Sequence, residues 1–205
     1  LSLVIPVYTQ DLGVLRKTLE ALDFQKDVSF EVIVVLNPPV PFEFKTQAYD
    51  LKILTSNVGV NRARNIGLKE SSCDIVLFLD ADCQPTDSDF LKNYLVRLRN
   101  EPELTALGGV YTSPNQSSVY SRAYHSIQIE WLYSGVVNRN LSTQFLLGGN
   151  FAIKKSKIDK TIFDDKIIFG GSEVGFFLEL YAKGLKMRLD PALTVVHTSK
   201  LDRPG

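Results

Sequence analysis

The sequence predicts an α/β fold in which a mostly parallel sheet carries helices on both faces. Four short apolar runs, rich in Val, Ile and Leu, are typical of strands buried on both faces: Leu3–Val7, Glu31–Leu36, Lys52–Thr55 and Ile75–Leu79. Helical patterns lie between the runs, and this alternation indicates an α/β sheet with right-handed crossovers. We expect residues 1–205 to form one domain, because a chain of this length buries a sizeable core.

Three helices are predicted in the first half of the chain. Leucines recur every three or four positions across Leu12–Leu22, which defines one face of a helix. Asn61 is predicted to cap a second helix that continues through Lys69. Thr86-x-x-Asp89 resembles a capping box and predicts a third helix over Phe90–Leu98.

The second half of the chain is less regular. A strand is expected near Ala106–Tyr111, and an aromatic stretch over Tyr120–Val137 favours a helix. Another helix is predicted over Ser172–Lys183, with Gly184 as the residue that ends it. Two short strands, Lys186–Leu189 and Leu193–His197, are expected to complete the fold.

Composition narrows the classes of function. Lys plus Arg and Asp plus Glu both total 23, so the basic excess typical of nucleic-acid binding is absent. No apolar run approaches the roughly 18 residues of a membrane span, and no basic segment marks a signal peptide. A strand between Cys73 and Cys83 would hold them too far apart for a disulfide. Free thiols suit a cytoplasmic protein, with peripheral association at the inner face of a membrane left open.

Two carboxylates follow the fourth predicted strand. Asp80 and Asp82 are two residues apart, so along an extended chain they point the same way. In an open α/β sheet, ligands bind beyond the carboxyl ends of the strands. Paired carboxylates there suit Mg²⁺ or Mn²⁺ bound together with phosphate oxygens. The alternative is an Asp pair that only stabilises a turn.

Three stretches together resemble the family 2 glycosyltransferases, which have the GT-A fold. They are Leu3–Tyr8, Asn57-x-Gly59-x-x-x-Ala63-Arg64-Asn65-x-Gly67, and Phe78-Leu79-Asp80-Ala81-Asp82. Later matches are Gly148-Gly149-Asn150 and Gly170-Gly171-Ser172-Glu173, so the resemblance covers nearly the whole chain. It implies transfer of a sugar from a nucleotide diphosphate-sugar, with Mn²⁺ or Mg²⁺, to a glycan, lipid-linked or protein acceptor, as in cell-envelope polysaccharide synthesis.

The resemblance assigns the metal and the donor nucleotide to particular residues. It implies that Asp82 binds the metal and that His197, at the end of the last strand, helps to hold it. A structural role for that histidine is an equal alternative. The implied donor contacts are Pro6, Tyr8, Asn37, Asn61, Arg64 and Asp80. At Asn37 the family usually has carboxylates that grip the base or ribose; an amide still forms hydrogen bonds, so UDP is favoured but the nucleotide stays open.

The resemblance also suggests the catalytic base. The family usually has Glu-Asp where this chain has Ser172-Glu173, so Glu173 is the candidate that takes the proton from the acceptor hydroxyl. A single displacement by that base would invert the anomeric centre. The alternative is a helix-terminal Glu that interacts with the helix dipole. The implied sugar and acceptor pocket comprises Gly148, Gly149, Asn150 and Trp131. The structural alternatives are a plain β-turn for the glycine stretch and a place in an aromatic core for Trp131.

Two other functions remain open at this point. The departures at Asn37 and Ser172-Glu173 are compatible with a catalytically idle module that binds nucleotide-sugars. A sugar nucleotidyltransferase would need a glycine-rich basic loop after the first strand, and Pro6–Asp11 offers neither feature. The Gln-x-x-Arg-Trp motif of processive synthases is absent, which favours one transfer per encounter.

Overall fold

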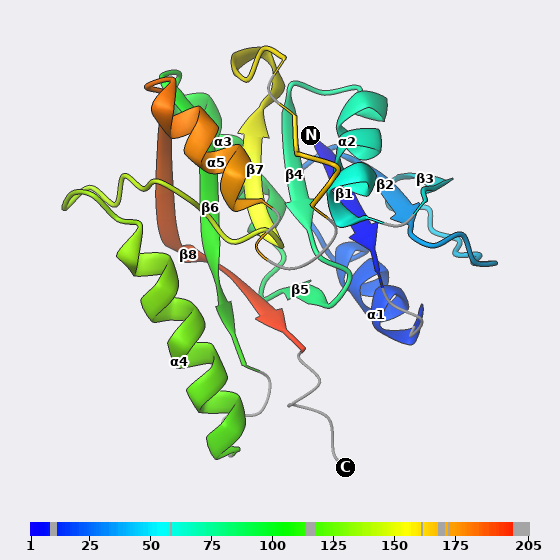
Figure 1. Ribbon diagram of the computed structural model, residues 1–205. Helices are drawn as coiled ribbons and strands as arrows, with labels where there is room; N and C mark the ends of the chain where they lie inside the picture. Colours follow the sequence, from blue (N-terminus) through cyan, green and yellow to red (C-terminus); the bar gives the residue numbers. More distant parts are fainter. Residues whose placement is uncertain are drawn as a thin grey trace.

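The fold was examined in a computed structural model that describes residues 1–8, 12–57, 59–113, 118–160, 162–167, 171 and 173–198. The elements along the chain are β1 (Ser2–Val7), α1 (Leu12–Leu22), β2 (Glu31–Leu36), β3 (Asp50–Thr55), α2 (Val60–Glu70), β4 (Ile75–Leu79), β5 (Cys83–Pro85), α3 (Phe90–Asn100), β6 (Leu104–Thr112), α4 (Val119–Ser134), β7 (Asn150–Lys154), a 3₁₀ turn (Lys155–Lys157), α5 (Val174–Ala182) and β8 (Lys186–His197). Figure 1 shows their arrangement.

These strands form one mixed sheet in the order β3-β2-β1-β4-β7-β6-β8-β5. The β3, β2, β1 and β4 strands pair in parallel, as do β6 and β8. Strand β7 runs antiparallel to both of its neighbours, and β5 pairs antiparallel with the end of β8. The α/β prediction with a largely parallel sheet is confirmed.

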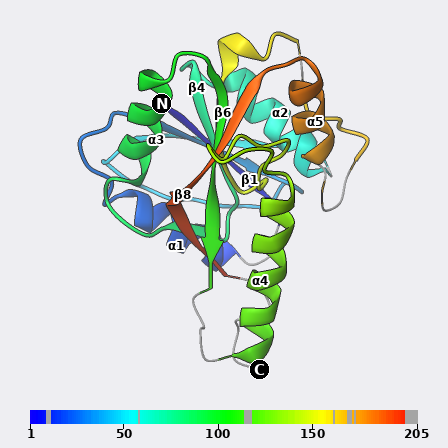
Figure 2. The same ribbon diagram turned by 90° about the vertical axis from the view of Figure 1, so that its left-hand side faces the viewer.

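Two apolar cores lie on opposite faces of this sheet. Alternate β1 side chains belong to different cores, because successive residues of a strand point to opposite faces. Leu3 and Ile5 pack in the core covered by α1 and α3, whereas Val4 packs in the core covered by α2 and α5. Figure 2 shows these two helix pairs on the two sides of the strands. Helices therefore cover both faces, as predicted.

Two glycines fix how helix α2 starts and how closely it packs on the sheet. A Cβ on Gly67 would overlap the side chain of Val4 on β1, so only glycine allows this approach. Gly59 has a φ of 130°, which favours glycine, and it is the residue that begins the helix. The prediction that Asn61 caps this helix is wrong, because the N-cap is Gly59 and Asn61 is the second residue of the helix.

The structure corrects several predicted strands. Strand β3 was expected to be buried but alternates between exposed and half-buried residues, because it forms an edge of the sheet. The last two predicted strands are one continuous strand, β8, which carries Pro191 at its middle. Strands β5 and β7 were not predicted, since β5 has three residues and β7 follows a diglycine that reads as a turn.

Helix ends differ from the predictions by one to three residues. Helix α4 ends at Ser134 instead of Val137, with Gly135 as its C-cap. The N-cap of α3 is Asp89, without a capping side-chain hydrogen bond, and the Thr86 hydroxyl donates to the carbonyl of Thr194, so the capping-box prediction is wrong. Gly184 follows α5 with a φ of 72°, as expected of a glycine that ends a helix. The described part of the chain contains no helix long and apolar enough to cross a bilayer.

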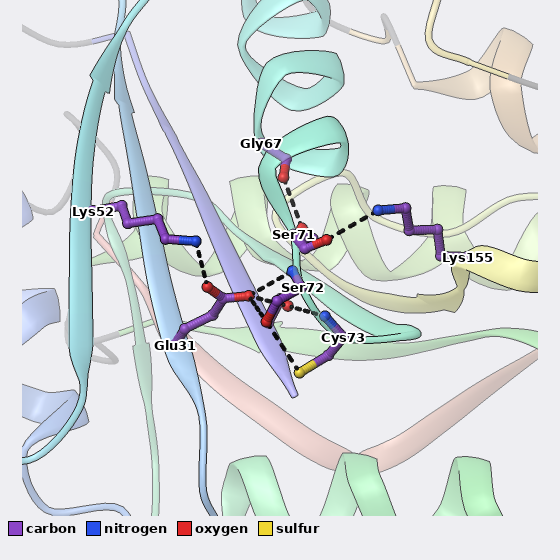
Figure 3. A network of polar contacts seen from close by, with 8 residues as sticks. Glu31, Lys52, Gly67, Ser71, Ser72, Cys73 and Lys155 are labelled. Carbon is purple, nitrogen blue, oxygen red and sulfur yellow. Dashed lines mark hydrogen bonds and ion pairs between the residues drawn. The ribbon is translucent and has the colours of Figure 1, made fainter.

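Glu31 is the first residue of β2 and lies at the amino ends of the parallel strands, opposite the predicted site. Its carboxylate accepts hydrogen bonds from the Ser72 backbone and hydroxyl at 2.7 and 2.6 Å, from Ser2 at 2.7 Å, and from Lys52 at 2.9 Å. Figure 3 shows Lys52 approaching it from one side and Ser72 from the other. Burial alone would raise the pKa of Glu31, but these hydrogen bonds outweigh it and lower the pKa to about 2.

We expect Glu31 to make stability depend on acid. Its pKa falls from 4.5 in the unfolded chain to about 2 in the folded protein. The stabilisation is therefore complete above the unfolded value and is lost as pH drops through the folded one. The shift corresponds to about 3 kcal/mol of unfolding free energy. Urea denaturation of wild type and Glu31→Gln between pH 4.5 and about 2 should show that the free energy of unfolding falls more steeply with decreasing pH in wild type. The same dependence on pH in both proteins would contradict this assignment.

Candidate active site

A cleft of about 720 Å³ opens at the carboxyl ends of β1 and β4. Its walls come from α2, α4 and the start of α5, and its floor from the segment between β4 and β5. Ten of the thirteen predicted site residues line it: Pro6, Tyr8, Arg64, Asp80, Asp82, Trp131, Gly148, Gly149, Glu173 and His197. A larger but more open hollow at the β3 edge holds none of them.

Strand pairing brings Asp80 against the diglycine. Leu79 at the end of β4 pairs with Asn150 at the start of β7, so the next residue lies beside Gly149. The Asp80 amide donates to the Gly149 carbonyl at 3.2 Å. A Cβ on Gly149 would overlap the Asp80 carboxylate, and one on Gly148 would come within 2.7 Å of Arg64 and Glu173. Both glycines are therefore required for the acidic groups to converge.

A second strand pair brings His197 to Asp82. Cys83 on β5 pairs directly with His197 on β8, and the Asp82 side chain lies next to the imidazole, with Oδ2 3.6 Å from Nε2. The Cys83 sulfur lies within 4.8 Å of ligand atoms of both. Burial raises the pKa of this thiol well above its usual value, which keeps it protonated. An oxygen and a nitrogen donor at a cleft suit Mn²⁺ or Mg²⁺, so these residues fit the predicted metal.

Arg64 is a buried cation between two acids. Only 3% of its side chain is exposed, and its guanidinium lies 3.6 Å from Asp80 and 3.7 Å from Glu173. It donates to the Gly148 carbonyl at 3.1 Å and to the Asn61 side chain at 3.2 Å. Its position on the inner face of α2 makes it a fixed part of the cleft wall. Arg64 is therefore not a solvated residue of the outer helix face.

The carboxylates of the cleft carry more negative charge than Arg64 compensates. The pKa of Asp80 is raised to about 6, mainly by burial; Arg64 opposes the shift, and Asp82 and Glu173 add to it. A third of the Asp80 side chain remains open to the cleft. A cation bound in the cleft would relieve this repulsion.

Glu173 lies nearest Nη1 of Arg64, whereas Asp80 lies nearest Nη2. It is the residue that precedes α5, and its side chain is 13% exposed at the cleft. Its side chain makes no hydrogen bond that caps the helix. The preceding Ser172 and Gly170, which belong to the matching motif, lie outside the described residues. A carboxylate placed at a cleft wall in this way is accessible to a bound hydroxyl.

Three predicted site residues do not line the cleft. Asn150 is fully buried, with its amide donating to the carbonyls of Val110 and Leu193 and its oxygen accepting from Tyr94. Its side chain points toward the neighbouring strands and links β7 to β6 and β8.

Asn61 and Asn37 are the other two corrections. Asn61 is fully buried and donates to the carbonyl of Asp164 at 2.8 Å while accepting from Arg64, so it positions that guanidinium and not a nucleotide. Asn37 directly follows β2 and is 2% exposed; no described residue hydrogen-bonds its side-chain amide. Its burial places it behind the cleft surface, so the structure gives no direct contact for it.

Sequence reasoning missed Tyr111. Its hydroxyl accepts from the Gly149 amide at 2.9 Å, and its ring stacks on His197 with centroids 4.7 Å apart. It therefore links the diglycine to the His197 side of the cleft. A tyrosine at the end of an apolar strand gives no signal of this role, which depends on β6 lying beside β8.

The fold is that of the GT-A proteins, and the cleft at the carboxyl ends of its strands is acidic. The model for glycosyl transferase family 2 matches residues 2–162, and the chain belongs to this family.

Particular relatives support the same class. Glycosyltransferase AglE of Haloferax volcanii is 28% identical over 151 residues, which cover 69% of this chain and 49% of AglE. The mannosyltransferase PcManGT from Pyrobaculum calidifontis, solved with GDP-Man and Mn²⁺, superposes with a TM-score of 0.71 at 16% identity, over 96% of this chain and 56% of its own. S. aureus TarS 1–349 with UDP-GlcNAc gives 0.70 at 16% identity, over 100% of this chain and 59% of its own. The chain thus spans about half the length of these relatives.

Proposed function

We propose that this protein is a metal-dependent, inverting glycosyltransferase that moves a sugar from a nucleotide diphosphate-sugar to an acceptor hydroxyl. The observation that carries the proposal is the convergence of Asp80, Asp82, Arg64 and Glu173 in one cleft. Membership of the family and neighbours solved with GDP-Man and UDP-GlcNAc support it. UDP is the favoured carrier, with GDP as its alternative.

The donor half of the cleft binds the nucleotide. Pro6 and Tyr8 at the end of β1 offer an apolar wall on which a base can pack, and Tyr8 is half exposed there. Asp80 accepts hydrogen bonds from ribose hydroxyls. Asp82 and His197 would hold Mn²⁺ or Mg²⁺, and the ion would supply positive charge against the negative charge that builds on the departing diphosphate.

The acceptor half supplies the base. Glu173 accepts the proton of the acceptor hydroxyl while that oxygen attacks the anomeric carbon, and the nucleotide diphosphate leaves from the opposite face. Arg64 holds the Glu173 carboxylate in place through its contact at 3.7 Å. Gly148 has no side chain, which leaves room for the Arg64 and Glu173 side chains to meet. One displacement inverts the anomeric centre.

Nucleotide binding tests the donor site directly. We expect calorimetric titration with UDP, GDP, CDP and ADP to show one nucleotide that binds at micromolar concentration in the presence of Mn²⁺. Binding should be lost without the metal and in Asp82→Ala, since that variant removes a metal ligand. Metal-independent binding that survives in Asp82→Ala would refute the metal site, and absence of binding by all four would refute the donor site.

A further inference from the structure

An exposed apolar stripe on α4 begins in the cleft and continues out of it. Tyr120, Tyr124, Ile127 and Trp131 follow one another at intervals of four, three and four residues, which places them on one face of the helix. Tyr124, Ile127 and Trp131 line the cleft, and Tyr120 lies a turn beyond it. Tyr120 is 79% exposed and Ile127 69% exposed. Large apolar side chains on successive exposed turns indicate a binding surface.

The stripe is separate from the face that attaches α4 to the protein. Ser121, His125 and Leu132 are buried and form the neighbouring face. Figures 1 and 2 show α4 extending past the ends of the strands, with its N-terminal end farthest from the sheet. Trp131, near the other end, packs on Phe145 with ring centroids 4.4 Å apart. The stripe therefore runs from the open end of the helix to the wall of the cleft.

We propose that the stripe binds an apolar chain carried by the acceptor, so that the acceptor is an amphiphile whose head group enters the cleft. This inference rests on the proposed function, because it assigns the acceptor to the site that contains Glu173. Its basis is continuity: the same helix face forms the cleft wall near the proposed base and the exposed surface outside it. When the reacting end of a ligand lies at the base, the rest of that ligand extends out of the cleft along this face.

The chemistry of the stripe favours an alkyl or prenyl chain over other occupants. From Tyr120 to Trp131 it covers about 16 Å of helix, longer than one sugar ring. Ile127, at its centre, has no flat face on which a sugar could stack. The charged residues of α4 are one Arg and one Glu, Arg122 and Glu130, and neither belongs to the stripe. A membrane-binding helix would pair its apolar face with several basic residues, and α4 does not.

The single tryptophan of the chain, Trp131, reports binding directly. We would follow its fluorescence during titration with octyl β-D-glucopyranoside, kept below micelle-forming concentrations, and with methyl β-D-glucopyranoside. The octyl compound should bind about tenfold more tightly or better, because its chain buries apolar surface. The double variant Tyr120→Ser/Ile127→Ser should lose this preference. Phe24→Ser, which changes an equally exposed aromatic residue after α1, should keep it.

Three results would overturn the proposal. Equal affinity for the two glycosides would make the stripe a platform for sugar rings. A preference for octyl that survives in the double variant would place the chain elsewhere. Stripe-dependent sedimentation with phosphatidylglycerol vesicles, without an octyl preference, would make it a membrane contact. Nucleotide titration of the same samples separates the two proposals. If the wild-type protein binds no nucleotide, the proposed donor site is refuted. If it binds nucleotide but shows no preference for the octyl compound, only the proposal for the stripe is refuted.

Discussion

Replacement of Glu173 by Gln is expected to lower the rate of sugar transfer about a thousandfold while donor affinity changes little. The amide keeps the size of the side chain but accepts no proton, and a general base typically contributes a factor of 10² to 10⁴. Donor affinity should be retained because the proposed nucleotide and metal contacts, Asp80 and Asp82, are left unchanged. Steady-state turnover and calorimetric donor binding, measured on the same preparation, test both halves of the expectation.

Glu173→Asp is the matched control for this change. It retains a carboxylate but withdraws it by one methylene, and a displacement of about 1 Å costs on the order of a hundredfold. The expected order of rates is therefore Glu, then Asp, then Gln. Equal rates for Gln and wild type would show that the base is another group. A wild-type protein that binds donor without turnover would instead be the idle binding module considered from the sequence.

Replacement of Arg64 by Met is expected to lower the free energy of unfolding by about 3 kcal/mol or more. The change removes a buried cation and leaves two carboxylates, Asp80 and Glu173, without it. It also removes the hydrogen bonds to Gly148 and Asn61. Because Arg64 lowers the pKa of Asp80, its loss raises that pKa further above 3.8, so the folded state holds the proton more tightly. The difference in the free energy of unfolding between wild type and Arg64→Met should therefore grow as pH rises through and above about 6.

Arg62→Met provides the comparison on the same helix. Arg62 is 43% exposed and pairs at 3.4 Å with Asp165, which is 48% exposed. Surface ion pairs of this kind contribute about 0 to 1 kcal/mol, so stability should barely change. Urea denaturation of both variants, at two pH values and with chelator present, checks the contrast. Similar small losses in the two variants would show that the Arg64 contacts contribute little.

Local pattern in the sequence determined the class of fold and the position of its acidic centre. Apolar runs revealed β1, β2 and β4 because those strands are buried along their length, and Asp80 and Asp82 follow directly where β4 ends. The order of the matching motifs indicated the family. Each motif can be recognised in the sequence because it serves a local structural requirement, such as the close approach of α2 to β1 at Gly67. These properties depend on residues near one another in the chain.

Only the tertiary structure decided which polar residues face the cleft. Asn61 and Asn150 belong to the same motifs as Arg64 and Gly149, yet both are fully buried, because helix rotation and strand register turn them into the protein. Tyr111 joins the site through the pairing of β6 with β8, and His197 reaches Asp82 through the pairing of β8 with β5. Such contacts join residues far apart in the chain, and their geometry depends on register and side-chain direction, which composition and spacing do not encode.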